Sequence, residues 1–204
     1  MVFYKNREKF GSLSVKIGIV FSKVMPSPNA WTLVTIIPTL IAFCMLVNEQ
    51  FLYAGAWFII AAFIDMIDGA VARVMVRTTK LGAYLDTIMD MYVEAIIIFC
   101  LLFASLPSFS VFGVVVPVYA WIFMMFFGAM MTTYAKSAAK EKGLVENELR
   151  GGLLERAERL LILFAGILLA AYNPLYLTYV VALLAVLTNI TALQRIWIAK
   201  KSVR

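Results

Sequence analysis

Four aspartates recur at helical spacing between residues 65 and 90 of an otherwise apolar part of the chain. They are Asp65, Asp68, Asp86 and Asp90. The first two are three residues apart and the last two are four apart, so each pair lies on one face of a helix. Two such helices joined as a hairpin would aim four carboxylates at a common point. Hard oxygen ligands in that number suit a pair of divalent cations, which commonly hold phosphates.

Small residues share the faces of these aspartates. Gly69 and Ala72 follow the first pair, and Gly82 precedes Asp86 by four residues. They would leave room for a bulky ligand, although small residues also line helix interfaces in membranes. The alternative for the aspartates is a set of acids that cap helix ends near water. We favour a functional site because carboxylates at membrane depth are costly and usually functional.

The complete spacing, D-x2-D-G-x2-A-R-x8-G-x3-D-x3-D, resembles the signature of the CDP-alcohol phosphotransferase family, which comprises integral membrane enzymes that make phospholipid head groups. The resemblance implies two Mg²⁺ ions, or Mn²⁺ in their place, on all four aspartates, with Asp90 also acting as the catalytic base. It implies that the CDP moiety contacts Asp65, Asp68, Gly69, Ala72, Arg73, Gly82 and Asp86. Glu94 extends the stripe of Asp86 and Asp90 by one more turn.

The composition indicates a membrane protein. Of 204 residues, 63% are hydrophobic, and there is no histidine. The lack of histidine excludes His-based catalytic triads and most zinc sites. Cys44 and Cys100 both lie in apolar segments, so we expect no disulfide framework.

Apolar segments of spanning length predict an all-α integral membrane protein with six transmembrane helices. The segments are approximately residues 30–47, 51–76, 82–104, 111–137, 153–171 and 175–198. Residues 3–24 mix basic and apolar residues at helical spacing, which predicts an amphipathic helix in the membrane interface. The expected organisation is a juxtamembrane segment, residues 1–29, followed by one membrane domain, residues 30–204.

The basic residues predict the orientation. Every Lys and Arg lies in the N-terminal arm, in residues 73–80, in residues 136–159 or near the C-terminus. Such an asymmetry places both termini and the aspartates on the cytoplasmic side of a multi-pass protein of the cell (plasma) membrane. The net charge of +6 then reflects topology and anionic ligands, and we expect no nucleic-acid partner.

A second group of charged residues, all basic, belongs to the same side. It consists of Lys136, Arg156, Arg159 and Arg195. These cations could capture a phosphate dianion on an acceptor alcohol, although the positive-inside bias alone would also place them there. The runs Y-x-K, E-R-x-E-R and Q-R around them resemble the inositol-phosphate-using branch of the family, in which the matching Lys136, Arg159 and Arg195 hold the inositol phosphate. Ala138 replaces an arginine found in some members of that branch.

The leading hypothesis is transfer of a phospholipid moiety from CDP-diacylglycerol or CDP-archaeol to inositol phosphate, with release of CMP. Glycerol-3-phosphate as the acceptor and CDP-inositol as the donor stay open. A divalent cation transporter would also use carboxylates, but no inverted repeat is evident. A non-catalytic scaffold is disfavoured because every residue of the motif is present. The family resemblance also implies a homodimer.

Overall fold

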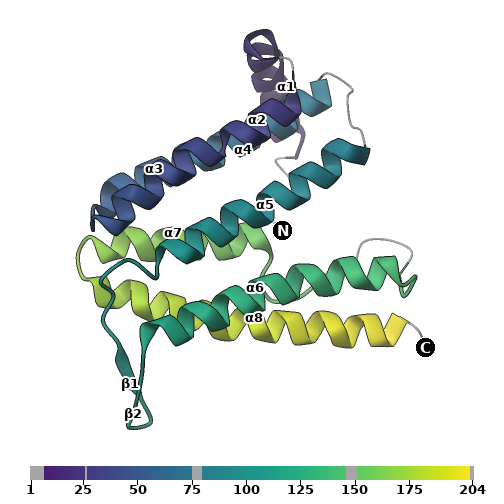
Figure 1. The fold of residues 1–204 in the computed structure, drawn as a ribbon. Helices are drawn as coiled ribbons and strands as arrows, with labels where there is room; N and C mark the ends of the chain where they lie inside the picture. The colour runs from purple at the N-terminus through teal and green to yellow at the C-terminus, as the bar shows by residue number, and fades with distance from the viewer. Residues whose placement is uncertain (1–6, 26, 75–79, 146–150, 203–204) are drawn as a thin grey trace. The chain divides into compact units, whose positions relative to one another are not determined.

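The computed structural model describes residues 7–25, 27–74, 80–145 and 151–202. These ranges form helices and one small β-hairpin (Figure 1). In chain order the elements are α1 (Arg7–Val24), α2 (Pro28–Val34), α3 (Ile36–Val47), α4 (Phe51–Val74), α5 (Lys80–Cys100), β1 (Phe109–Val111), β2 (Val114–Val116), α6 (Val118–Glu141), α7 (Arg156–Ala170) and α8 (Pro174–Ser202). The last residues of the predicted second span, 75 and 76, lie outside the described residues.

The helical class predicted from the sequence is confirmed. Within the described ranges, three segments are long and apolar enough to cross a membrane, namely Phe51–Val71, Val118–Glu141 and Pro174–Ser202. Ile36–Val47 is a shorter apolar helix. The number of six spans therefore stays a prediction.

The first predicted span is divided at Thr35, where α2 ends and α3 begins. Pro38 has no backbone N–H to donate to the carbonyl four residues earlier, and its ring crowds that carbonyl. The hydroxyl of Thr35 donates to the carbonyl oxygen of Trp31 at 3.2 Å, and that of Thr39 to the carbonyl oxygen of Thr35 at 2.8 Å. Both hydroxyl groups thus bond a carbonyl of the preceding helical turn where α2 meets α3.

The prediction of a fourth span beginning at residue 111 is wrong. Residues 109–116 form an antiparallel hairpin, with Phe109 opposite Val116 and Val111 opposite Val114. A two-residue turn joins the strands, and Gly113 has a φ of +82° there. A short run of β-branched and aromatic residues fits a strand as well as a helix, so hydrophobicity alone cannot separate the two.

The chain divides into two compact units, which we describe separately. Unit 1 contains residues 1–44 and 56–96. Its core joins α1, α2 and α4 through Trp31, Ile67 and Val71, with Ile17 and Phe21 packed against them. Part of the apolar face of α1 is therefore buried against protein. Val15, Ile19, Val20 and Val24 are exposed and remain available to a membrane.

Unit 2 contains residues 45–55 and 97–204. In it α6 and α8 lie side by side and run in the same direction, while α7 runs in the opposite direction (Figure 1). The amide of Asn189 donates to the carbonyl oxygen of Met124 at 2.9 Å, which links α8 to α6. A Cβ added at Gly128 would lie 2.7 Å from the Asn189 amide nitrogen, so α6 and α8 approach closely because this residue is glycine.

Candidate functional site

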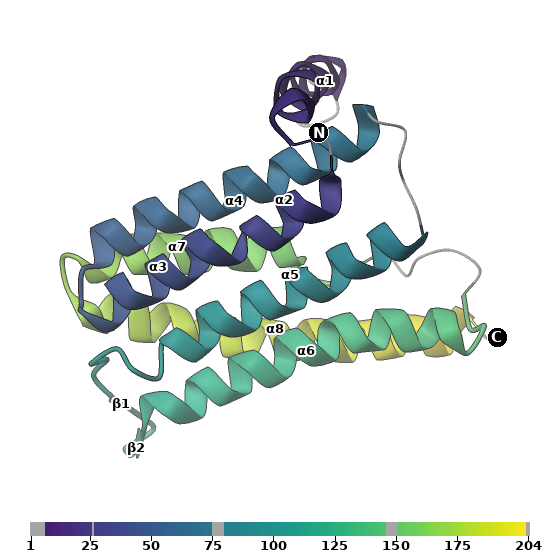
Figure 2. The ribbon, with the colours of Figure 1, turned by 45° about the horizontal axis from the view of Figure 1, so that its top comes forward.

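The four aspartates lie on two consecutive helices of unit 1. Asp65 and Asp68 are on α4, and Asp86 and Asp90 are on α5, as the spacing predicts. The two helices run in opposite directions (Figure 2). Asp68 lies six residues before the end of α4 and Asp86 six residues after the start of α5. Each is therefore about 9 Å along its helix axis from the ends that residues 75–79 join.

The environments of these carboxylates differ. Asp68 is buried, Asp65 and Asp90 are half-buried, and Asp86 is exposed. One turn after Asp90, Glu94 is 2% exposed. Gly69 and Gly82 are half-buried beside the aspartates, whereas the side chains of Ala72 and Arg73 lie outside the described part of the chain.

The described residues include no group of three or more His, Cys, Asp or Glu side chains that could hold a metal ion. The convergence of four carboxylates that the spacing predicts is thus not seen among them. Four anionic groups repel one another at close range, so their convergence depends on cations between them. By the chemistry of the donor set, carboxylate oxygens from two helices fit a hard divalent cation. The metal site stays a prediction.

The four basic residues predicted to bind an acceptor phosphate all lie in unit 2. Lys136 is near the end of α6, Arg156 and Arg159 are in the first turns of α7, and Arg195 is near the end of α8 (Figure 1). Arg159 and Arg195 are 2% and 7% exposed, whereas Lys136 and Arg156 are half-buried.

Arg195 is held by two backbone carbonyls. Its Nε donates to the carbonyl oxygen of Gly151 at 3.1 Å, and its Nη1 donates to that of Thr132 at 2.9 Å. The charge of Arg195 is repelled by that of Arg159 and attracted by that of Glu155. Two buried guanidinium groups are therefore kept near each other. Burial of like charges is costly, and the Glu155 carboxylate offsets part of that cost for Arg195.

The loop that leads into α7 is fastened to α8 by residues that sequence reasoning missed. The backbone N–H of Leu153 donates to the side-chain oxygen of Gln194 at 2.9 Å, and that of Leu154 donates to the Thr191 hydroxyl at 3.2 Å. Gly152 has a φ of +115°, and a Cβ there would lie 2.6 Å from the Thr191 methyl carbon. The Gly-Gly pair before α7 was the available sequence indication of this close contact.

The start of α7 carries its own cap. The carboxylate of Glu158 accepts a hydrogen bond from the backbone N–H of Glu155 at 2.9 Å. Glu155 is the N-cap residue and Glu158 the third residue of the helix. Such a bond satisfies a donor that a helix start would otherwise leave unpaired. The two glutamates of the E-R-x-E-R run therefore fix the first turn from which Arg156 and Arg159 project.

The chain resembles known proteins over nearly its whole length. It is 29% identical over 197 residues to the archaetidylinositol phosphate synthase of Pyrococcus horikoshii, with 97% of this chain and 96% of that protein covered. Two crystal structures of the Mycobacterium tuberculosis phosphatidylinositol phosphate synthase have the same fold, each with a TM-score of 0.78 at 23% identity.

One of these structures has CDP-DAG bound and covers 92% of this chain and 94% of its own. The other is a complex with manganese and citrate, and covers 92% and 88%. In addition, residues 25–200 match the CDP-alcohol phosphatidyltransferase family. This match includes every aspartate of the motif and every basic residue of the second group. The chain belongs to the CDP-alcohol phosphatidyltransferase family of enzymes.

Proposed function

We propose that this enzyme transfers the phospholipid moiety of a CDP-linked lipid to a hydroxyl of inositol phosphate, with release of CMP. The observation that carries the choice of acceptor is the buried pair Arg159 and Arg195 in unit 2. A phosphate dianion is the kind of ligand that offsets two neighbouring guanidinium charges. The printed names of the relatives, which are synthases of inositol phosphate lipids, support the same acceptor.

The CDP-lipid donor is proposed to bind at the aspartates of unit 1. Asp65, Asp68, Asp86 and Asp90 would hold divalent cations, Mg²⁺ or Mn²⁺, at the diphosphate of the CDP-lipid. Such cations neutralise the phosphate oxygens and stabilise the leaving CMP. Gly69, Ala72, Arg73 and Gly82, in turn, would contact the CDP moiety, since small residues allow close approach and arginine pairs with phosphate.

Asp90 is the proposed general base. A neutral hydroxyl is a weak nucleophile, and removal of its proton assists attack. The hydroxyl oxygen forms a bond to the phosphorus that bears the lipid, and the bond from that phosphorus to the CMP oxygen breaks. The hydroxyl proton passes to the Asp90 carboxylate.

The basic group of unit 2 binds and orients the acceptor. Arg195 is fixed by the carbonyls of Gly151 and Thr132, so its remaining N–H donors have a defined direction. Arg159 is buried beside it, while Lys136 and Arg156 are more exposed and add positive charge. A rigid guanidinium positions a phosphate better than a flexible ammonium does.

The cellular setting is part of the proposal. The confinement of Lys and Arg to the four regions named above supports a multi-pass protein with both termini and the active site on the cytoplasmic side of the plasma membrane. Both CDP-diacylglycerol and CDP-archaeol are candidate donors, because apolar surface does not distinguish diacyl from ether-linked tails. We propose a homodimer, as the family resemblance implies.

The test is CMP release by the purified full chain in detergent with Mg²⁺. CDP-diacylglycerol or CDP-archaeol is the donor, and inositol-1-phosphate, glycerol-3-phosphate and free inositol are offered separately. We expect CMP only with inositol-1-phosphate. Release with glycerol-3-phosphate would overturn the acceptor and leave the aspartate chemistry in place. Release with free inositol would show that the basic group binds no acceptor phosphate.

A further inference from the structure

The β1–β2 hairpin of unit 2 carries an unusual residue at its tip. Phe112 and Gly113 form the two-residue turn, with φ values of +51° and +82°. Turns with two positive φ angles favour Asn-Gly or Asp-Gly, because a bulky L-residue is strained in that conformation. Phe112 is nevertheless fully exposed, so no packing within unit 2 accounts for an aromatic side chain there. A bulky residue at a strained and fully exposed turn position points to a role for its side chain.

The base of the hairpin is fixed to the helices. Phe109 stacks on Trp121 at 5.8 Å between ring centroids and meets Tyr179 edge-on at 5.1 Å. The Thr178 hydroxyl donates to the carbonyl oxygen of Pro107 at 2.9 Å. The hairpin is therefore anchored to the first turns of α6 and α8, and it projects sideways from them (Figures 1 and 2). Its direction is set by these contacts.

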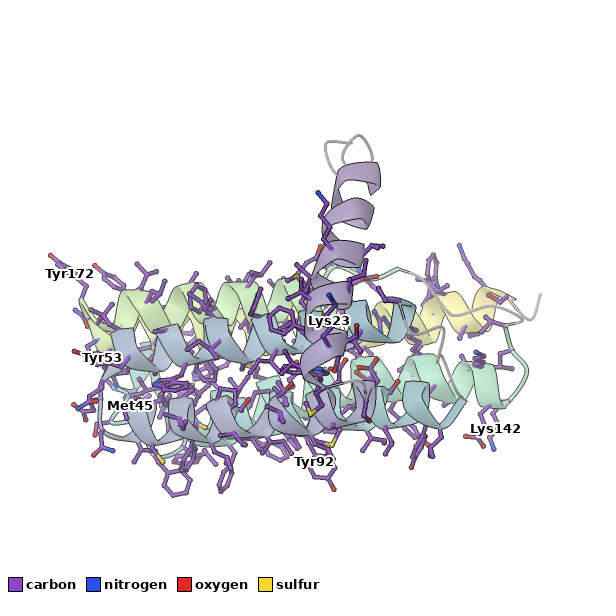
Figure 3. The ribbon with its side chains drawn as sticks, turned by 90° about the horizontal axis from the view of Figure 1, so that it is seen from above. Lys23, Met45, Tyr53, Tyr92, Lys142 and Tyr172 are labelled. Carbon is purple, nitrogen blue, oxygen red and sulfur yellow. The ribbon has the colours of Figure 1, made fainter. Side chains whose placement is uncertain are left out.

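The surroundings have the composition of a membrane interface. No Lys, Arg, Asp or Glu occurs between residues 95 and 135. Aromatic residues gather where α6 and α8 begin and α7 ends; they are Tyr119, Trp121, Tyr172, Tyr176 and Tyr179. Tyr172 lies at one end of unit 2 and Lys142 at the other (Figure 3). Tyrosine and tryptophan are enriched at the level of the lipid head groups.

We propose that the β1–β2 hairpin is a lipid anchor, whose tip residue Phe112 inserts between phospholipids at this end of unit 2. Val114 and Val115 are exposed beside it and extend the apolar surface. A two-stranded hairpin has unpaired backbone groups along both outer edges, and these exclude it from the hydrocarbon centre. An interfacial position places the edges among head groups and the Phe112 ring among the upper acyl chains.

A second copy of the chain is a weaker candidate than lipid for the partner that contacts the tip of the hairpin. Stable protein interfaces bury about 800 Å² on each partner. Two strands of three residues each offer only a small part of that area. A lipid surface needs no matching protein patch, and it suits a stretch that has no charge.

The direct test is photo-crosslinking in phosphatidylcholine–phosphatidylglycerol vesicles. The full chain carries p-benzoylphenylalanine in place of Phe112, which keeps an aromatic L-residue at the turn. Mass spectrometry after illumination should show a shift of one phospholipid, as for the same replacement of Phe123, which is exposed on α6. Replacement of Lys142, at the opposite end, should give no lipid product. A covalent dimer through position 112, or no adduct at all, would overturn the proposal.

A second variant separates lipid contact from turn strain. Phe112→Asn creates the favoured Asn-Gly turn, so the hairpin itself should form more readily. If lipids cover the tip, amide hydrogen exchange of residues 109–116 in vesicles should nevertheless become several-fold faster, because the inserted ring is lost. Unchanged or slower exchange would mean that water covers the hairpin, and it would contradict the proposal.

Discussion

The Arg195 guanidinium donates from Nη1 to the carbonyl oxygen of Thr132 at 2.9 Å and thereby joins α8 to α6. The same side chain donates from Nε to Gly151, in the loop before α7. Arg195 therefore connects α8 both to α6 and to the loop that leads into α7. It has a structural role as well as the proposed phosphate-binding role.

Replacement of Arg195 should therefore reduce stability as well as activity. Arg195→Lys keeps the positive charge, but a single ammonium cannot reproduce the two fixed bonds to Gly151 and Thr132. We expect the free energy of unfolding in detergent to fall by about 1–3 kcal/mol, since a buried carbonyl loses its donor. Thermal unfolding measures this change. Lys200→Gln, at an exposed position of the same helix, is the control and should have no effect; equal stability of the two variants would contradict the structural role.

The Gly152 backbone predicts a difference between two glycine variants. Gly152→Ala places a Cβ against Thr191, whereas Gly143, also at positive φ, has nothing within 4 Å of an added Cβ. Gly143→Ala should lower the free energy of unfolding by about 1–2 kcal/mol, because alanine is strained in the left-handed conformation. Gly152→Ala should lower the free energy of unfolding by more than this. It should also raise the KM for the acceptor, because it displaces the loop that leads to Arg156 and Arg159. Steady-state kinetics beside thermal unfolding provide the test, and equal effects of the two substitutions would show that the Thr191 contact is unimportant.

Asp90→Asn tests the proposed base. The side chain is nearly isosteric but cannot accept the hydroxyl proton, so turnover should fall by about 10²–10⁴-fold. Binding of the CDP-lipid should be largely retained, which equilibrium binding can measure in the presence of Mg²⁺. Glu141→Gln, an exposed change in unit 2, is the control. Undiminished turnover would remove Asp90 as the base.

Divalent cations should stabilise the chain as well as activate it. A ligand that binds only the folded state adds about 2.7 kcal/mol when its free concentration is about 100 times Kd. Titration of the chelator-treated protein with Mg²⁺ or Mn²⁺ should therefore raise Tm, and a chelator should abolish CMP release. The rise in Tm should be smaller in Asp86→Asn and intact in Glu49→Gln, an exposed position of unit 2. An equal rise in both variants would place the cation elsewhere.

The sequence was informative where local spacing determines structure. The intervals between Asp65 and Asp68 and between Asp86 and Asp90 predict helices, and both pairs lie on helices. The family could also be recognised from the motif, and the match over residues 25–200 confirms it. Helical periodicity depends only on neighbours in the chain, which is why these predictions succeeded.

Long-range contacts could not be found in the same way. The bond from Leu153 to Gln194 spans 41 positions, and no local pattern reports it. The hairpin was missed because its apolar run has no charge or clear period, and the strained Phe112 occupies a turn position where asparagine is usual. Packing against Trp121 and Tyr179 stabilises a conformation that residue preferences do not predict.

The break between α2 and α3 falls at Thr35, inside the first apolar segment. Trp31, before this break, is packed in the core of unit 1 and so sets the course of α2. The hydroxyl groups of Thr35 and Thr39 each donate to the backbone carbonyl oxygen four residues earlier, so neither hydroxyl is left unpaired in this buried stretch. Threonine can therefore stand in this apolar segment without an unpaired hydroxyl, and a Thr39→Val change would keep the shape of the buried side chain while removing its bond to the Thr35 carbonyl oxygen.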